Sequence, residues 1–188
     1  VNDDGSLGDR NDVKCIGLED KLGIHASPTC VMSFGENDGA TGWLIGAENT
    51  GMAAMFTMMN NARLNVGIQG VGLAEQATQL AMSYAADRVQ GRAPDAERGD
   101  NTPVPISTHP DVRNMLMTMR ALTDAARAIC YENGVFHDLA HFGGDERAKA
   151  FNELLTPISK AFSTDIANEV SSLAVQIHGG MGLSLIHI

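Results

Sequence analysis

The chain has 188 residues, enough to bury a hydrophobic core in one or two domains. Hydrophobic residues make up 44% and charged residues 19%, a composition typical of globular and not of disordered proteins. The formal net charge of −10 repels nucleic-acid phosphates and anionic membranes, and no run of about 18 apolar residues is available to span a bilayer. A nucleic-acid partner and a membrane span are therefore not expected.

The cysteines and the first residues bear on location and completeness. Cys15, Cys30 and Cys130 form neither a CxxC pair nor an even set, so we expect no disulfide framework, no zinc site and a reducing cytoplasm. Residues 1–5 contain no initiator methionine and no secretory signal pattern. This favours a chain that is an incomplete piece of a longer protein.

Residues 1–46 predict a small β region. Short apolar runs at 13–18, 30–34 and 43–45 are separated by Gly, Asp and Asn, which indicates three short strands joined by turns. Three strands bury too little apolar surface to be stable alone, so a missing N-terminal partner is expected.

From about residue 50 the apolar period becomes helical, which predicts one helix of roughly 40 residues or two nearly collinear ones. Gly67, Gly70 and Gly72 lie inside it, where each glycine costs about 1 kcal/mol against alanine. Close helix packing or a small kink is expected to offset that cost. The predicted buried positions are Met52, Met55, Phe56, Met59, Val66, Leu73, Ala77, Leu80, Ala81 and Tyr84.

Residues 91–105 predict a loop, after which a second helix begins with Thr108 as its cap and Pro110 in its first turn. Its predicted apolar stripe is Val112, Met115, Leu116, Met119, Leu122, Ala126 and Ile129.

A third helical region starts near Asp145, is expected to kink or restart at Pro157, and ends at Gly179-Gly180. Its predicted buried face is Ile158, Phe162, Ile166, Val170, Leu173 and Ile177. The chain is thus expected to be mainly α, with a helical bundle at 48–182 after a β region at 1–47. Residues 183–188 fit no periodic pattern and are expected to be a non-native tail.

Two stretches resemble the acyl-CoA dehydrogenase family. Lys21-Leu22-Gly23-Ile24-His25-Ala26-Ser27-Pro28-Thr29-Cys30, followed by Gly42-Trp43-Leu44-Ile45-Gly46, is similar to the end of the family's middle β domain. Gln176-Ile177-His178-Gly179-Gly180-Met181-Gly182 is similar to the opening of its C-terminal signature, Q-x-x-G-G-x-G. The resemblance covers residues 1 to about 183 and implies the family's C-terminal helical bundle, preceded by the last strands of its middle β domain. Segments 25–32, 58–63 and 109–113 are nearest to the branch that includes 3-methylmercaptopropionyl-CoA dehydrogenase.

The resemblance implies an FAD-dependent enzyme that dehydrogenates an acyl-CoA thioester between its α and β carbons. It also implies a homodimer or homotetramer, with electron-transfer flavoprotein as the electron acceptor. Arg88 matches a family arginine that contacts the FAD pyrophosphate of the neighbouring subunit, and Gln176, Gly179 and Gly180 match residues that reach the same FAD. Arg63 resembles an arginine near the substrate site.

Two departures from the family pattern limit these expectations. A family phenylalanine is absent from the loop after Arg88, with Gly91 near its place. The family's catalytic glutamate falls beyond the end of the chain, so no catalytic residue is assigned and the chain alone is expected to be inactive.

Several alternatives stay open on the residues alone. Arg88 and Arg92 also suit a helix C-terminus electrostatically, and Gln176 with its glycines also suits a plain helix cap. His137 and His141 have the spacing of two zinc ligands but lack an obvious third, and no metal is assigned. The rival functions are a non-enzymatic helical interaction or oligomerisation module, a flavin acyl-CoA oxidase and a flavin-binding DNA-damage-response relative.

Overall fold

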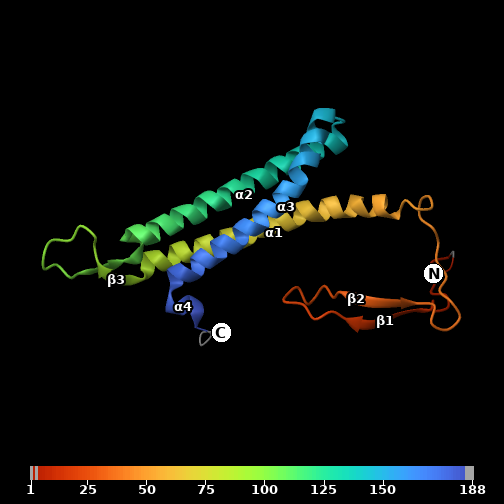
Figure 1. Cartoon of the computed structure of the whole chain (residues 1–188), viewed down its shortest axis with the longest axis horizontal. Coiled ribbons are helices and arrows are strands. Elements are labelled where there is room, and N and C mark those ends of the chain that lie inside the picture. The colour runs from red at the N-terminus through yellow and green to blue at the C-terminus, as the bar shows by residue number, and fades with distance from the viewer. Residues whose placement is uncertain (1, 3, 185–188) are drawn as a thin grey trace. The chain divides into compact units, whose positions relative to one another are not determined.

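The computed structural model describes residue 2 and residues 4–184 of the chain. The chain divides into two compact units, Val1–Met52 and Ala53–Ile188 (Figure 1). No helix of the described residues is long and apolar enough to cross a membrane. Most of the expected non-native tail lies outside the described residues.

The first unit contains an antiparallel pair of strands, β1 (Val13–Leu18) and β2 (Cys30–Phe34). Val13 pairs with Phe34 and Leu18 with Cys30, and the register shifts between Cys15 and Gly17. The third predicted strand, at residues 43–45, is wrong. Trp43 and Ile45 are 83% and 91% exposed. Their apolar run has no neighbouring strand in the described chain with which to form a ladder.

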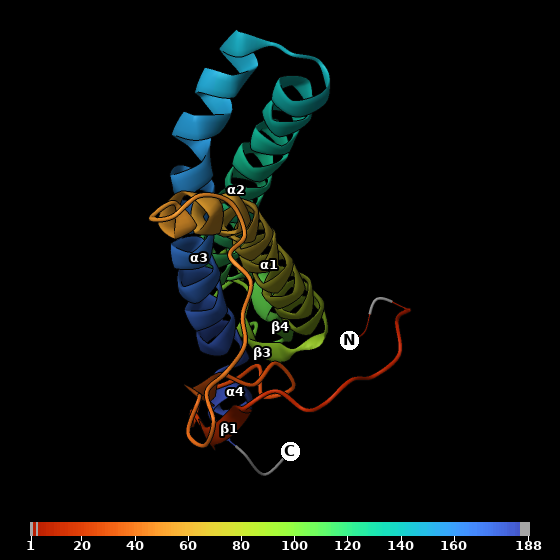
Figure 2. The same ribbon diagram turned by 90° about the vertical axis from the view of Figure 1, so that its right-hand side faces the viewer.

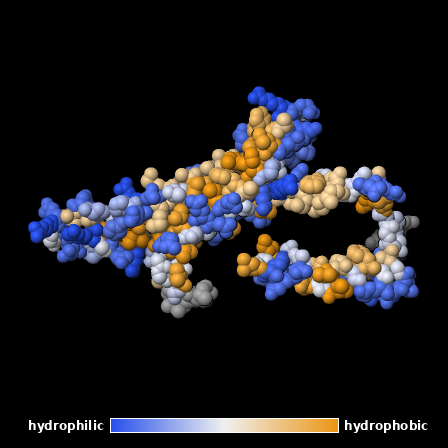
Figure 3. Space-filling view, viewed as in Figure 1, coloured by the Kyte–Doolittle hydropathy of each residue, from blue (hydrophilic) through white to orange (hydrophobic). Residues whose placement is uncertain are grey.

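The long helix predicted from residue 50 is confirmed as one continuous element, α1 (Gly51–Asp87). The face predicted to be buried is only partly right. Ala81 is fully buried and Ala77 and Tyr84 pack against the core, whereas Leu73 and Leu80 are each 58% exposed. The buried face is instead built mainly from small residues: Gly67, Gly70, Val71, Ala74, Thr78, Ala81 and Ala85. Figure 3 shows apolar side chains on the surface of the bundle.

Two glycines let α1 approach a second long helix, α3 (Glu146–His178), at backbone distance. A Cβ atom at Gly67 would lie 2.9 Å from the carbonyl oxygen of Ser159, and one at Gly70 would lie 2.6 Å from that of Ser163. Gly72 has open space around it. The close helix packing expected from the glycines is therefore confirmed at Gly67 and Gly70.

The third long helix, α2 (Pro110–Phe142), packs antiparallel to α3, and the N-terminal half of α1 diverges from this hairpin (Figures 1 and 2). The N-terminal ends of α2 and α3 differ in whether a side chain caps them. Asp145 caps α3 through its carboxylate, which accepts from the backbone N–H groups of Arg147 and Ala148. Thr108 does not cap α2, because its hydroxyl donates to the carbonyl of Pro105 at 2.7 Å.

Pro157 does not restart the third helical region, since α3 runs without interruption from Glu146 to His178. A proline inside a helix leaves the carbonyl four residues earlier without its donor. Pro157 and Glu153 are both exposed, so water can satisfy that carbonyl.

The predicted loop at 91–105 contains secondary structure that the sequence did not indicate. Two short strands, β3 (Val89–Arg92) and β4 (Pro103–Pro105), pair antiparallel and lead into a turn of 3-10 helix, η1 (Ile106–Thr108). A last short helix, α4 (Gly180–Leu183), follows α3. The loop prediction missed β3 and β4 because they are only four and three residues long.

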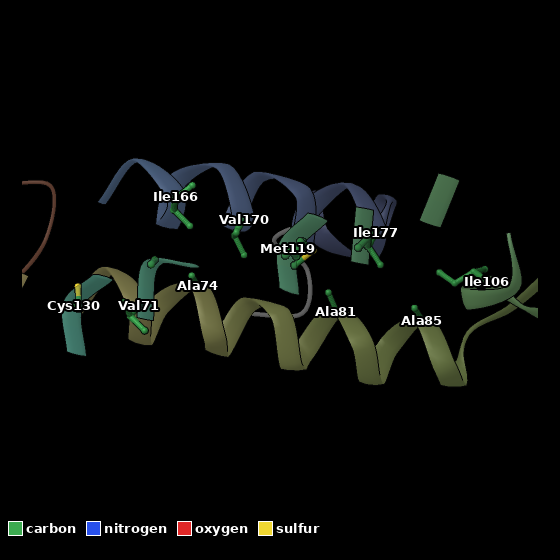
Figure 4. Packing of buried hydrophobic residues seen from close by; sticks show 12 residues of the cluster. Val71, Ala74, Ala81, Ala85, Ile106, Met119, Cys130, Ile166, Val170 and Ile177 are labelled. Atoms are coloured by element: carbon green, nitrogen blue, oxygen red, sulfur yellow. The ribbon is translucent and has the colours of Figure 1, made fainter. Parts of the chain in front are cut away.

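The core lies where the three long helices meet (Figure 4). Its apolar part includes Met119, Val170 and Ile177, and a row of polar side chains lies beside it. Thr78 and Thr123 hydroxyls lie 3.3 Å apart, and the Asn133 amide donates to the Ser159 hydroxyl at 3.1 Å. Every buried side-chain nitrogen and oxygen within the described residues has a hydrogen-bond partner. The polar row therefore avoids the free-energy cost of burying a polar group without a partner.

Charged side chains tie α1 to α2 at the rim of the core. The Glu75 carboxylate accepts from Arg127, and Arg127 also bonds Asp124. The Gln79 amide and the Arg127 guanidinium together lower the pKa of the Glu75 carboxyl.

Replacing Gly70 by alanine should destabilise the bundle, because the new methyl group would meet the Ser163 backbone. We expect Gly70→Ala to lower the free energy of unfolding by about 1–3 kcal/mol. The matched control, Gly72→Ala, should raise it by up to about 1 kcal/mol through helix propensity alone. Urea unfolding followed by circular dichroism compares the two. Equal stability of both variants would contradict the close approach of α1 and α3.

Replacing Glu75 by glutamine should lower stability at neutral pH by less than about 1 kcal/mol, since the pair is partly exposed. The folded-state pKa of Glu75 is lowered, so its contribution is present above the unfolded carboxyl pKa of about 4.3 and is lost as pH falls through the folded value. The difference between wild type and Glu75→Gln should therefore vanish in acid. Unfolding measured from pH 7 to pH 3, with exposed Glu169→Gln as control, tests this. A difference that persisted at pH 3 would contradict the assignment.

Candidate functional site

One end of the bundle carries a surface pocket lined by all four residues predicted to bind a cofactor: Arg88, Gln176, Gly179 and Gly180. The pocket is formed where α1 ends, α2 begins and α3 passes into α4. The predicted residues come from two segments that are far apart in sequence. The fold therefore brings the two parts of the prediction to one place.

The backbone of Arg88 is fixed on both sides. Its N–H donates to the carbonyl of Tyr84 at 2.8 Å, which continues the hydrogen bonding of α1. Its carbonyl accepts from the N–H of Ile106 at 2.8 Å, where β3 lies against the start of η1. The Arg88 side chain is exposed, so a clamped backbone presents a cation to the pocket.

The opposite wall is the turn between α3 and α4. Gly179 has φ of +56°, a left-handed value that favours glycine, and its N–H donates to the carbonyls of Val175 and Gln176 at 3.1 Å each. A Cβ atom at Gly179 or Gly180 would meet open space. A ligand can therefore approach this backbone closely.

The pocket is also lined by side chains that the sequence did not assign to it, among them Tyr84, His109, His178 and the acidic Asp111. The Tyr84 and His178 rings stack with their centroids 4.5 Å apart. His109 Nε2 lies 2.8 Å from the carbonyl oxygen of Gln90, so this nitrogen carries the hydrogen. The sequence could have indicated Tyr84 as a pocket residue, because it lies four residues before Arg88 and that spacing puts both on one helix face.

The donor set of the pocket fits a dinucleotide cofactor. A guanidinium offers forked, permanently charged donors that match phosphate oxygens. A primary amide at Gln176 adds a neutral donor and acceptor, and the open glycine turn adds accessible backbone. A pyrophosphate-bearing group such as FAD therefore suits these residues.

Arg63 lies elsewhere, roughly 37 Å along α1 from Arg88 at the helical rise of 1.5 Å per residue. Its guanidinium donates to the Asn60 side-chain oxygen at 3.2 Å and lies 5.7 Å from the centroid of the Phe56 ring. The structure does not bring Arg63 to the pocket that holds Arg88.

A second pocket opens where α1 diverges from the α2–α3 hairpin, and it is lined by amide, imidazole and charged side chains, including Asn60, His137 and Lys149. The His137 and His141 rings lie 4.2 Å apart, centroid to centroid. Across residues 2 and 4–184, no group of three His, Cys, Asp or Glu side chains is placed to hold a metal ion.

Comparison with known proteins identifies the class. The family model "Acyl-CoA dehydrogenase, C-terminal domain" matches residues 49–187. The chain belongs to the acyl-CoA dehydrogenase family, and its helical unit is that family's C-terminal domain, as the motifs predicted.

Two curated relatives give the finer placement. The chain is 51% identical over 181 residues to 3-methylmercaptopropionyl-CoA dehydrogenase of Ruegeria pomeroyi, a match that covers 95% of this chain and 30% of the relative. It is 39% identical over 191 residues to a butyryl-CoA dehydrogenase of Syntrophomonas wolfei, covering 97% of this chain and 31% of the relative. The chain therefore spans about a third of the length of these relatives.

Solved structures confirm the mainly α fold. Butyryl-CoA dehydrogenase from Megasphaera elsdenii superimposes with a TM-score of 0.71 at 26% identity, over 92% of this chain and 40% of that one. Caenorhabditis elegans ACDH-11, solved in complex with C11-CoA, gives a TM-score of 0.78 at 23% identity, over 97% of this chain and 28% of that one. The second likeness concerns the fold alone.

Proposed function

We propose that this chain supplies the cofactor-holding helical domain of an FAD-dependent acyl-CoA dehydrogenase, which oxidises an acyl-CoA thioester between its α and β carbons. The observation that carries the proposal is the single pocket lined by Arg88, Gln176, Gly179 and Gly180. These residues match the family motifs, and the chemistry of their donors suits a pyrophosphate.

Each residue has a distinct task in this proposal. Arg88 pairs with the pyrophosphate through its forked donors, and Gln176 hydrogen-bonds the cofactor. Gly179 and Gly180 keep side chains out of the way, so that the cofactor can reach the backbone. When bound, FAD supplies the hydride acceptor. No carboxylate of this chain is proposed as the base that removes the α proton.

We propose that the FAD bound at this pocket belongs to a neighbouring subunit, so that the protein is a homodimer or homotetramer. Supporting this, α1 exposes large apolar side chains such as Leu73, Leu80 and Met82, at 58%, 58% and 47% exposure. Burying such surface is a main source of free energy for obligate association.

We propose Arg63 as a substrate-site residue that organises charge near the anionic CoA thioester. Asn60 and Phe56 support this role, because the hydrogen bond and the cation–π contact hold the guanidinium in one place. A placed cation loses less side-chain entropy when an anion binds.

A short acyl group is the proposed substrate. The names of the two curated relatives, 3-methylmercaptopropionyl-CoA and butyryl-CoA dehydrogenase, both specify short acyl chains. Electron-transfer flavoprotein is the proposed electron acceptor. A chain from the structure described as the electron transferring flavoprotein of Acidaminococcus fermentans matches this one with a TM-score of 0.72 at 26% identity. Three free cysteines support a cytoplasmic location.

Removing the Arg88 guanidinium should weaken FAD binding to the full-length protein encoded by the gene. A charge-assisted hydrogen bond is lost, so we expect the dissociation constant for FAD to rise about 10- to 150-fold in Arg88→Ala. The dissociation constant of Arg88→Lys should lie between those of the wild type and Arg88→Ala, because lysine keeps the positive charge but lacks the forked donors of the guanidinium. Flavin fluorescence titration of the apoprotein measures both variants.

Arg92→Ala is the matched control, since Arg92 ends β3 and does not line the pocket. A wild-type protein that stays colourless and binds no FAD would favour the non-enzymatic interaction module. If Arg88→Ala and Arg92→Ala weakened FAD binding equally, the effect would come from the overall loss of positive charge and not from a specific contact of Arg88.

Substrate preference should follow the two curated relatives. For the full-length protein encoded by the gene, we expect kcat/KM for 3-methylmercaptopropionyl-CoA and butyryl-CoA to exceed that for palmitoyl-CoA by at least about 10-fold, because a pocket shaped for a short chain rejects added methylenes. Reduction of electron-transfer flavoprotein measures turnover, and hydrogen peroxide release tests for oxidase behaviour. Efficient use of palmitoyl-CoA would overturn the short-chain assignment.

A further inference from the structure

The stacked pair Tyr84 and His178 joins the two segments that supply the cofactor pocket. It is the one ring stack between α1 and α3 within the described residues, with centroids 4.5 Å apart and an interplanar angle of 24°. Each ring adjoins a predicted site residue. The Tyr84 carbonyl accepts from the N–H of Arg88, and His178 directly precedes Gly179.

The His178 imidazole is held in one orientation by two contacts. Its Nδ1 lies 2.8 Å from the carbonyl oxygen of Ala174, and because a carbonyl only accepts, Nδ1 carries the hydrogen. This bond folds the ring back along the last turn of α3, and the stack on Tyr84 holds its face. His178 is half-buried, which limits competition from water.

The glycine turn depends on its neighbours for its position. Gly179 and Gly180 have no side chains, and a Cβ atom at either would touch nothing within 4 Å. Backbone hydrogen bonds from Gly179 to Val175 and Gln176 and from Gly182 to Gly179 hold the turn, and Gly182 also packs against His178. A Cβ atom at Gly182 would lie 3.0 Å from the His178 Cβ and 2.8 Å from the Val175 carbonyl oxygen, so the chain returns tightly against His178.

We infer that the Tyr84–His178 stack is the positioning pair of the cofactor pocket. It sets the distance between Arg88 on one wall and Gln176 with the glycine turn on the other. Neither ring is assigned a contact with the cofactor. The inference rests on the proposed FAD role of the pocket, and its chemistry is preorganisation, because a wall already in place costs less free energy to order when the ligand binds.

Two substitutions at His178 separate the stack from the rest of the residue. His178→Phe keeps an aromatic ring on Tyr84 and removes the hydrogen bond to Ala174. His178→Leu keeps an apolar side chain and removes the ring. For the full-length apoprotein, we expect the dissociation constant for FAD to rise about 2- to 12-fold in His178→Leu, the value of one aromatic pair, and to stay within about 2-fold in His178→Phe.

A measurement without cofactor checks the same pair independently. Amide hydrogen exchange at Gly179 and Gly182 should be faster in His178→Leu than in wild type and unchanged in His178→Phe, since the turn loosens when its anchor is lost. Tyr84→Leu should reproduce the His178→Leu effect from the other ring. In the Tyr84→Leu/His178→Leu double variant, FAD should bind no more weakly than in the worse single variant.

The outcomes separate this inference from the proposed function. Wild-type FAD affinity in His178→Leu, equal weakening in His178→Phe and His178→Leu, or additive losses in the double variant would each overturn the positioning role. Faster exchange in His178→Leu together with a wild-type protein that binds no FAD would refute the cofactor role, while showing that the stack orders the turn. If His178→Leu loses its helical circular dichroism, Tyr84→Leu decides by the same criteria.

Discussion

The approach of α1 to α3 at Gly67 and Gly70 is the constraint from which the rest of the helical unit follows. A Cβ atom at Gly70 would lie 2.6 Å from a backbone oxygen of α3, so no other residue fits without moving the helices apart. Close approach at two positions, one turn apart, fixes both the depth and the rotation of α1. That rotation turns Val71, Ala74, Thr78, Ala81 and Ala85 inward and leaves Leu73 and Leu80 outside.

The same rotation sets the geometry of the pocket. Tyr84 and Arg88 lie three residues after the buried Ala81 and Ala85, at the C-terminal end of α1 and beside the end of α3. The strand pair β3–β4 then holds the Arg88 carbonyl through Ile106. Helix packing several turns away therefore brings Tyr84 and His178 within reach of each other, and their stack then spaces the two walls of the pocket.

The polar row in the core adds direction to this packing. Thr78 meets Thr123 across α1 and α2, and Cys130 meets Ser163 across α2 and α3, with the sulfur and oxygen 3.2 Å apart. Hydrogen bonds have narrow distance and angle requirements, while apolar contacts between small residues tolerate sliding. The row thus selects one register among several that small-residue packing would allow.

The sequence by itself determined the order and approximate bounds of three long helical regions, because a sustained period of apolar residues and end signals such as Asp145 and Gly179 are local. It left open whether the first region was one helix or two and whether the third restarted at Pro157, and the structure shows one helix in each. The sequence also determined the family, and the C-terminal motif at 176–182 supplies three of the four predicted residues that line the pocket. Only the tertiary structure decided which face of α1 is buried. Hydrophobicity alone favours burying leucine, but the close approach of α3 leaves room only for glycine, so Gly67 and Gly70 are buried and Leu73 and Leu80 are exposed. The tertiary structure alone paired Tyr84 with His178 and left residues 43–45 without a ladder, because these depend on what lies across space from each residue.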